Sequence, residues 1–114
     1  MQAVINMDAS YAVPRRHPRH KINVNLGVTP FASGVRASGL GNDVSPRGLG
    51  LFAPVDLNVG DLIFIQLAIG ASMKFELPAT VRHRNGFHYG VEFEDSAPSE
   101  HDMRNICQML IAGA

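Results

Sequence analysis

A run of basic residues near the start of the 114-residue chain could bind anions. Arg15, Arg16 and Arg19 stand there among two histidines, a proline and a lysine. Arginine carries its N–H donors in a planar fork, so it pairs with phosphates and with base edges through two hydrogen bonds at once. The cluster therefore indicates either an anion-binding segment or a solvated basic tail.

A second group, from Asp43 to Gly48, places a carboxylate and a hydroxyl beside a predicted turn. In an extended chain residues two apart point the same way, so Asp43 and Ser45 share one face while Val44 points into the core. The sequence Ser45-Pro46-Arg47-Gly48 suits a type I turn. Asp43 and Ser45 either stabilise this turn through local hydrogen bonds or, with the arginines nearby, hold a ligand.

Other kinds of chemical site find little support in the sequence. The five histidines and the single cysteine, Cys107, have no zinc-ligand spacing. His83 and His88 flank a predicted hairpin turn and are interpreted as exposed residues of that hairpin. Ser45 lies in no nucleophile elbow, and no phosphate loop or dinucleotide fingerprint occurs. We therefore predict no catalytic residue, no metal site and no cofactor, and an enzyme is the weakest class.

Charge and composition limit the partners and the compartment. Ten Lys and Arg balance ten Asp and Glu, which argues against a nucleic-acid polymer or a membrane surface as partner. A single cysteine allows no intramolecular disulfide, and no apolar stretch is long enough for membrane insertion. Residues 1–14 lack the features of a secretory signal and are predicted to form a flexible leader. We expect a cytoplasmic protein with one domain over residues 15–114.

Alternating apolar residues predict about six short strands. Pro30 ends the first strand, Pro78 indicates an edge strand or a bulge, and Asn85-Gly86 predicts a hairpin. The expected strands are 22–29, a short strand within the Gly-rich loop 32–41, 49–52, 62–69, 75–82 and 87–93.

A helix is predicted after the last strand. Ser99 resembles its N-cap, and an apolar stripe runs along it at helical spacing through Met103, Ile106, Cys107, Leu110 and Ile111. Strands so close together leave no room for helical crossovers. The sheet is therefore mostly antiparallel and curls into a small barrel or sandwich with the helix packed on it.

Arg15-x-x-x-Arg19 and Asp43-x-Ser45-x-x-Gly48, in this order, resemble the two signature motifs of the PilZ domain family. Further similarity at Gly48-Leu49-Gly50-Leu51 and Tyr89-Gly90-Val91-Glu92-Phe93 extends the resemblance over about residues 15 to 112. The resemblance implies an all-β fold, a six-stranded antiparallel β-barrel with one C-terminal α-helix packed on it. It also implies a receptor for the bacterial second messenger cyclic di-GMP.

The resemblance also implies a role for each motif residue. The arginines would donate to phosphates and to guanine O6 and N7, with Arg16 stacked on a guanine face. Asp43 would accept from guanine N1–H and N2–H₂, Ser45 would add a hydroxyl contact, and Gly48 would let the ligand approach its backbone. The implied ligand-binding residues are Arg15, Arg16, Arg19, Asp43, Ser45 and Gly48.

The implied function is that of a receptor and adaptor without catalysis. Binding would change the conformation of the leader and signal to an unidentified downstream protein, for example in motility or exopolysaccharide regulation. An alternative is a PilZ-like protein-interaction module that does not bind nucleotide. A third possibility, a small enzyme on a β-barrel, would need a paired acid and base that the sequence does not offer.

Overall fold

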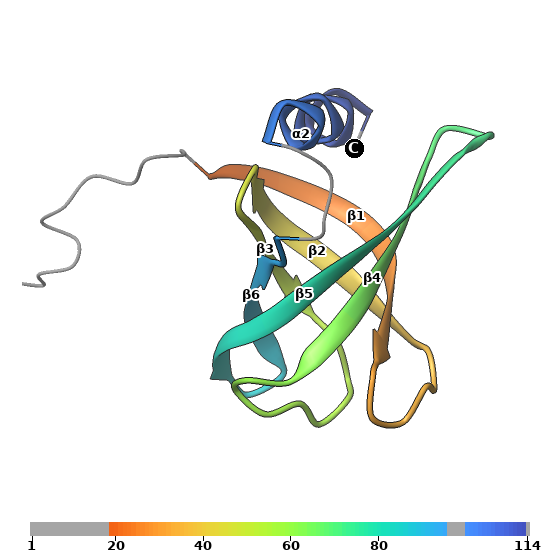
Figure 1. The fold of residues 1–114 in the computed structure, drawn as a ribbon. Helices are drawn as coiled ribbons and strands as arrows, with labels where there is room; N and C mark the ends of the chain where they lie inside the picture. Colours follow the sequence, from red (N-terminus) through yellow and green to blue (C-terminus); the bar gives the residue numbers. More distant parts are fainter. Residues whose placement is uncertain (1–18, 96–99, 114) are drawn as a thin grey trace, which may run out of the picture.

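Six strands and one helix form the part of the chain that the structure describes, residues 19–95 and 100–113. All strand pairs of this computed structural model are antiparallel and close into a barrel in the order β1-β2-β3-β6-β5-β4 (Figure 1). The predicted six-stranded antiparallel barrel with one C-terminal helix is thereby confirmed. The elements are β1 (His20–Pro30), β2 (Ala37–Ser45), β3 (Gly48–Phe52), β4 (Leu62–Ile69), β5 (Met73–Asn85), β6 (His88–Phe93) and α2 (Glu100–Gly113).

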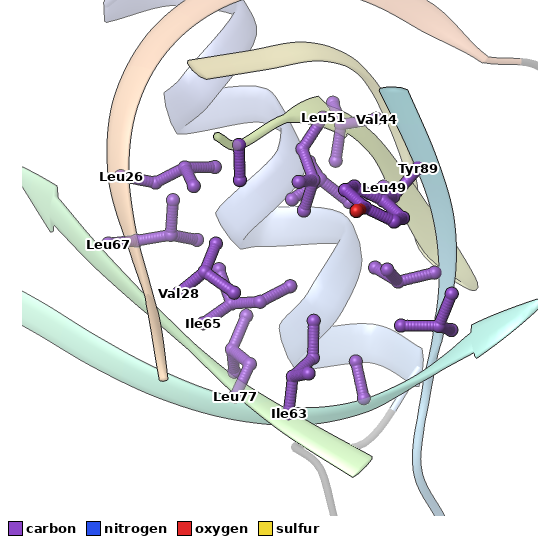
Figure 2. Packing of buried hydrophobic residues seen from close by; sticks show 14 of the residues in the cluster. Leu26, Val28, Val44, Leu49, Leu51, Ile63, Ile65, Leu67, Leu77 and Tyr89 are labelled. Carbon is purple, nitrogen blue, oxygen red and sulfur yellow. The ribbon is translucent and has the colours of Figure 1, made fainter. Parts of the chain in front are cut away.

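Alternate residues of each strand fill the inside of the barrel. On β4, Ile63, Ile65 and Leu67 are buried, whereas the residues between them are more exposed. Figure 2 shows these side chains packed with leucines and valines of the other strands and with Tyr89. Burying one such aliphatic side chain contributes roughly 1.5–3 kcal/mol. The core therefore fixes the register of the strands, and with it the residues that face outward.

Helix α2 lies across one end of the barrel and packs against β1, β2 and β4 (Figure 1). Met103, Ile106, Cys107 and Leu110 are buried, as predicted from their helical spacing. Ile111 is 39% exposed, so the prediction is wrong at this position. At about 100° per residue it lies about 80° around the helix from Met103, at the edge of the apolar stripe. The predicted cap, Ser99, falls outside the described residues.

Strand β2 begins inside the Gly-rich stretch for which we predicted a loop with a short strand. From Ala37 onward this stretch pairs with β1 on one side and, from Leu40, with β3 on the other. A Cβ at Gly39 would lie 2.7 Å from the Phe52 carbonyl oxygen. A glycine is needed here because the neighbouring backbone comes close. Since glycine has no apolar side chain, the alternation of apolar residues that would predict a strand is missing.

Strand β5 contradicts the prediction drawn from Pro78. It lies between β4 and β6 in the closed barrel, so it is not an edge strand. The Pro78 carbonyl accepts a hydrogen bond from the Glu94 N–H at 2.9 Å, just beyond the end of β6. Pro78 is tolerated because its missing N–H falls where pairing with β6 has ended. The register irregularity of β5 lies instead between Val81 and His83.

Arg84 and Tyr89 fasten the connection between β3 and β4 to the opposite end of the barrel from α2. The Tyr89 hydroxyl donates to the Val55 carbonyl and accepts from the Leu57 N–H. The Arg84 guanidinium donates to the Leu57 carbonyl at 2.8 Å and pairs with Asp56. It also lies 5.4 Å from the centroid of the Tyr89 ring. Together these contacts, of which the Tyr89–Leu57 hydrogen bond is buried, hold the connection in one conformation.

Candidate functional site

Arg19 and Asp43, one from each sequence motif, form an ion pair although 24 positions separate them. The Arg19 Nε lies 2.8 Å from Asp43 Oδ1, and the two side chains are 26% and 37% exposed. Arg19 directly precedes β1, and β1 pairs with β2 in a register that sets Lys21 opposite Asp43. The pairing of these two strands therefore brings the two motifs together.

Asp43 faces outward because its neighbour Val44 is fully buried in the core, as predicted. Across the sheet it lies opposite Gly50 of β3. A Cβ at Gly50 would lie 2.8 Å from Asp43 Oδ2 and 2.9 Å from Oδ1. The carboxylate therefore extends over the bare backbone of β3, where any other residue type would displace it.

Ser45 and Gly48 lie at the hairpin between β2 and β3. Ser45 is only 2% exposed, and its Oγ accepts a hydrogen bond from the Arg47 N–H at 3.2 Å. A Cβ at Gly48 would collide with the carbonyl oxygen of Val91 on β6. Both residues thus have a role in the hairpin itself, and their predicted ligand contacts stay predictions.

A groove of about 450 Å³ opens beside Asp43 on the outer face of the barrel. We call it the Asp43 groove. Its lining adds two imidazoles and two amide side chains to the carboxylate, which suits hydrogen bonding to a polar, planar ligand. The residues lining it are Asn42, Asp43, Gly50, Leu51, His83, Asn85, His88 and Tyr89.

The structure therefore unites Arg19 with Asp43 and places Ser45 and Gly48 at the adjacent turn. Arg15 and Arg16 lie outside the described residues. The described part of the chain contains no cluster of three or more His, Cys, Asp or Glu residues that could hold a metal ion. Nor does any helix within that part have the length and apolar character needed to cross a membrane.

Of the residues that line the Asp43 groove, the sequence predicts only Asp43 as a site residue. Gly50 and Gly90 are predicted as strand residues and His83 as part of an exposed hairpin. The available signal was glycine inside two predicted strands, which often marks a close approach to the backbone. That the two glycines are neighbours across β3 and β6 follows only from the strand register.

The thiol of Cys107 has no part in this face. It lies on α2 among core residues and is 4% exposed. Burial raises the pKa of the Cys107 thiol from 9.0 to about 11, because the apolar surroundings disfavour the thiolate. The residue is thereby kept in its neutral, unreactive form, in agreement with its predicted place in the core.

Solved structures with the same barrel support the fold. The chain superposes on a PilZ domain of YcgR from Escherichia coli, determined with cyclic di-GMP, with a TM-score of 0.68 at 19% identity, covering 86% of this chain and 92% of that one. For the PilZ domain of CeSA from a cellulose-synthesizing bacterium the TM-score is 0.63 at 12% identity, with 83% and 96% covered. For the Bacillus subtilis inhibitor of motility, MotI, these values are 0.65 and 16%, with 88% and 51% covered, so the chain spans about half of that protein.

Sequence comparison identifies the family directly. A search of curated proteins gives no significant match. The family model described as the PilZ domain, however, matches residues 14–111. The matched range contains both motifs, and each motif contributes one residue to the Arg19–Asp43 ion pair. With this match over most of its length and a closed six-stranded barrel, the chain belongs to the PilZ domain family.

Proposed function

We propose that this protein is a receptor for cyclic di-GMP that acts as an adaptor, without catalysis of its own. The observation that carries the proposal is the Arg19–Asp43 ion pair at 2.8 Å, which joins the two motifs beside the Asp43 groove. The similarly folded YcgR domain, which was determined with cyclic di-GMP, supports the same ligand.

Arg19 and Asp43 together present the hydrogen-bonding groups that a guanine dinucleotide needs. Only Nε of Arg19 donates to Asp43 in this arrangement, and a guanidinium carries four further N–H donors for phosphate oxygens or guanine O6 and N7. Asp43 Oδ2 lies over the bare backbone of Gly50, where it accepts from guanine N1–H and N2–H₂. The ion pair holds both side chains in place before the ligand arrives, which lowers the ordering cost of binding.

Arg15 and Arg16 supply the remaining positive charge in this proposal. Arg15 donates to the phosphates, and Arg16 stacks on a guanine face. Because these residues precede Arg19 in the chain, a ligand held by all three links the N-terminal segment to the barrel. Binding thereby changes the conformation of residues near 10 to 21 and forms a new surface for a downstream protein.

Calorimetric titration of the full chain with cyclic di-GMP tests the proposal, with GTP as the specificity control. We expect micromolar or tighter binding of cyclic di-GMP and none of GTP. Asp43→Ala should weaken binding at least about tenfold, since it removes a charged hydrogen-bond acceptor. Glu76→Ala, which removes an exposed carboxylate on the other side of the barrel, should leave the affinity unchanged. No heat and no thermal shift with cyclic di-GMP would favour the interaction module that does not bind nucleotide.

Limited trypsin digestion tests the conformational part of the proposal. The enzyme cleaves after Arg15, Arg16 and Arg19, and cyclic di-GMP should slow this cleavage. Arg36 is exposed in the connection between β1 and β2 and serves as the internal control, because cleavage there should not respond to the ligand. Equal cleavage at the N-terminal arginines with and without saturating ligand would contradict the proposed change.

A further inference from the structure

A row of cross-strand neighbours lies at the Asp43 groove, and all of its members except the buried Gly90 line it. The register sets Asp43 of β2 opposite Gly50 of β3, Gly50 opposite Gly90 of β6, and Gly90 opposite His83 of β5. Residues opposite one another in an antiparallel sheet have their side chains on the same face. The row therefore has a carboxylate at one end, an imidazole at the other and two bare glycines between them, which we call the glycine strip (Gly50 and Gly90).

An irregularity in β5 turns His83 toward this row. Val81 is buried in the core, so strict alternation would point the residue two positions later inward as well. The register shifts between Val81 and His83, and both Arg82 and His83 are exposed. A β-bulge re-aims side chains in this way, and bulges occur preferentially beside binding sites.

The imidazole of His83 then lies against the backbone of Gly90. A Cβ at Gly90 would collide with Nε2 and Cε1 of His83 and would lie 2.6 Å from its Cδ2. The bare backbone of β6 thus receives the tip of the ring, which positions the imidazole at the end of the glycine strip. No side chain of the strip separates the ring from the groove in which Asp43 lies.

We infer that His83 is the second wall of the ligand site and stacks on a purine base whose edge is bound by Asp43. This inference rests on the proposed function. Asp43 and His83 line the same groove, and the glycines beneath them carry no side chain that would rise above the carboxylate and the imidazole. A flat ring can therefore lie on the outer face of the imidazole with its edge toward Asp43, and imidazole is one of the side chains on which bases stack. Asp43 then selects the hydrogen-bonding edge of the base, while His83 favours a purine by contact with its larger ring system.

Titration of cyclic di-GMP into the full-length variants His83→Ala and His83→Phe tests the inference. His83→Ala should weaken binding at least about fivefold without changing the stoichiometry, and His83→Phe should restore most of the affinity because it keeps an aromatic ring. His101→Ala is the matched control, since this exposed histidine lies on α2 rather than in the groove. Thermal unfolding of each variant checks that the fold is intact.

Nuclear magnetic resonance gives a readout that a merely structural role would not move. Stacking places the ring protons of His83 in the ring current of the base, so their signals should shift upfield on ligand addition while those of His101 stay in place. If the wild type binds but His83→Ala binds equally well, or the His83 ring signals move no more than those of His101, the inference fails and the proposed function stands. If the wild type does not bind, both fail.

Discussion

Two grooves on opposite sides of the barrel are each crossed by a row of cross-strand neighbours that contains glycine. In the Asp43 groove the row is Asp43, Gly50, Gly90 and His83. The other row is Ser38 of β2, Gly27 of β1, Gln66 of β4 and Glu76 of β5. We call its surroundings the Arg36 groove, which is lined by Asn25, Leu26, Arg36, Ser38, Gly39, Gln66, Leu67, Ala68, Lys74, Phe75 and Glu76.

The Arg36 groove is the larger, at about 790 Å³ against about 450 Å³, yet two of its polar side chains, Gln66 and Glu76, are hydrogen-bonded to each other. Thr29 donates to Gln66 Oε1 at 3.1 Å, and Gln66 Nε2 donates to Glu76 at 2.8 Å. The guanidinium of Arg36 covers Gly27, since Nη2 would lie 2.7 Å from a Cβ there. Neither signature motif contributes to this groove.

On the proposed function, neither the volume of a groove nor a glycine within it is enough to identify the ligand site. The Asp43 groove is distinguished by the ion pair beside it, in which Arg19 of the first motif meets Asp43 of the second. A planar guanidinium beside a carboxylate can match both the phosphates and the base edge of a nucleotide. Matched substitutions in the two grooves therefore test best which groove binds the ligand.

The largest difference is expected between Arg19→Ala and Arg36→Ala. Loss of Arg19 removes donors to the ligand and the partner of Asp43, so affinity for cyclic di-GMP should fall by about 100-fold. The melting temperature should fall by no more than about 4 °C, because a partly exposed ion pair contributes about 1 kcal/mol or less. Arg36→Ala should change the affinity by less than about twofold. Calorimetry checks both, and an equal loss in the two variants would contradict the assignment of the site.

Gly48→Ala should lower the stability of the fold, and it does not distinguish the two grooves. A Cβ at Gly48 meets the backbone carbonyl of Val91, which cannot move without disturbing the pairing of β3 with β6. Overpacking of this kind costs about 1–3 kcal/mol of unfolding free energy. Urea unfolding measures the loss, and a variant as stable as wild type would show that the two strands can separate locally at no cost.

Gly50→Ala and Gly27→Ala compare one glycine from each groove, and they differ in the side chains that the added methyl group would meet. At Gly50 the added methyl group meets the Asp43 carboxylate at 2.8 Å, so binding of cyclic di-GMP should weaken about tenfold. At Gly27 it meets the ends of two flexible side chains, Arg36 and Gln66, which can move away. Binding by Gly27→Ala should equal that of wild type, and calorimetric titration of both variants decides whether the glycine strip matters.

The smallest effect is expected at Cys107, which belongs to neither groove. With its pKa raised to about 11, the folded protein holds about a hundredfold less thiolate at pH 8 than an unperturbed thiol would. Alkylation by iodoacetamide should therefore be slow in all folded variants and fast in urea, and fast alkylation of the folded wild type would contradict the burial. The unfolded thiol ionises first as pH rises, so this group lowers stability between about pH 9 and 11 and has no effect below.

Much of the barrel could be predicted because half-buried strands alternate. The apolar run 62–69 appears in the structure as the expected strand. The expected hairpin is also present, but its turn lies one residue later, at Gly86-Phe87, because Asn85 still pairs with His88; Gly86 has the positive φ of 64° that such a turn uses. The start of β2 could not be predicted, since glycines at close backbone contacts leave no apolar pattern. Pro78 misled because its local preference does not show where the pairing with β6 ends.

Only the motif residues of the candidate site could be predicted from the sequence. The ion pair between Arg19 and Asp43 follows from two motifs expected to converge, but its partners across the sheet do not. Gly90 and His83 enter the face through the register of β3, β5 and β6, including an irregularity that no local pattern signals. Long-range register is set by the packed core as a whole, so it becomes visible only in the folded chain.

Backbone amide shifts on titration with cyclic di-GMP test the central claim most directly, since a 12.3 kDa protein gives well-resolved nuclear magnetic resonance spectra. We predict that the amides of Asp43, Gly50 and Gly90 shift on binding, while those of Gly27 and Gln66 do not. Shifts centred on Gly27 and Gln66, or none at saturating ligand, would contradict the assignment of the Asp43 groove as the site.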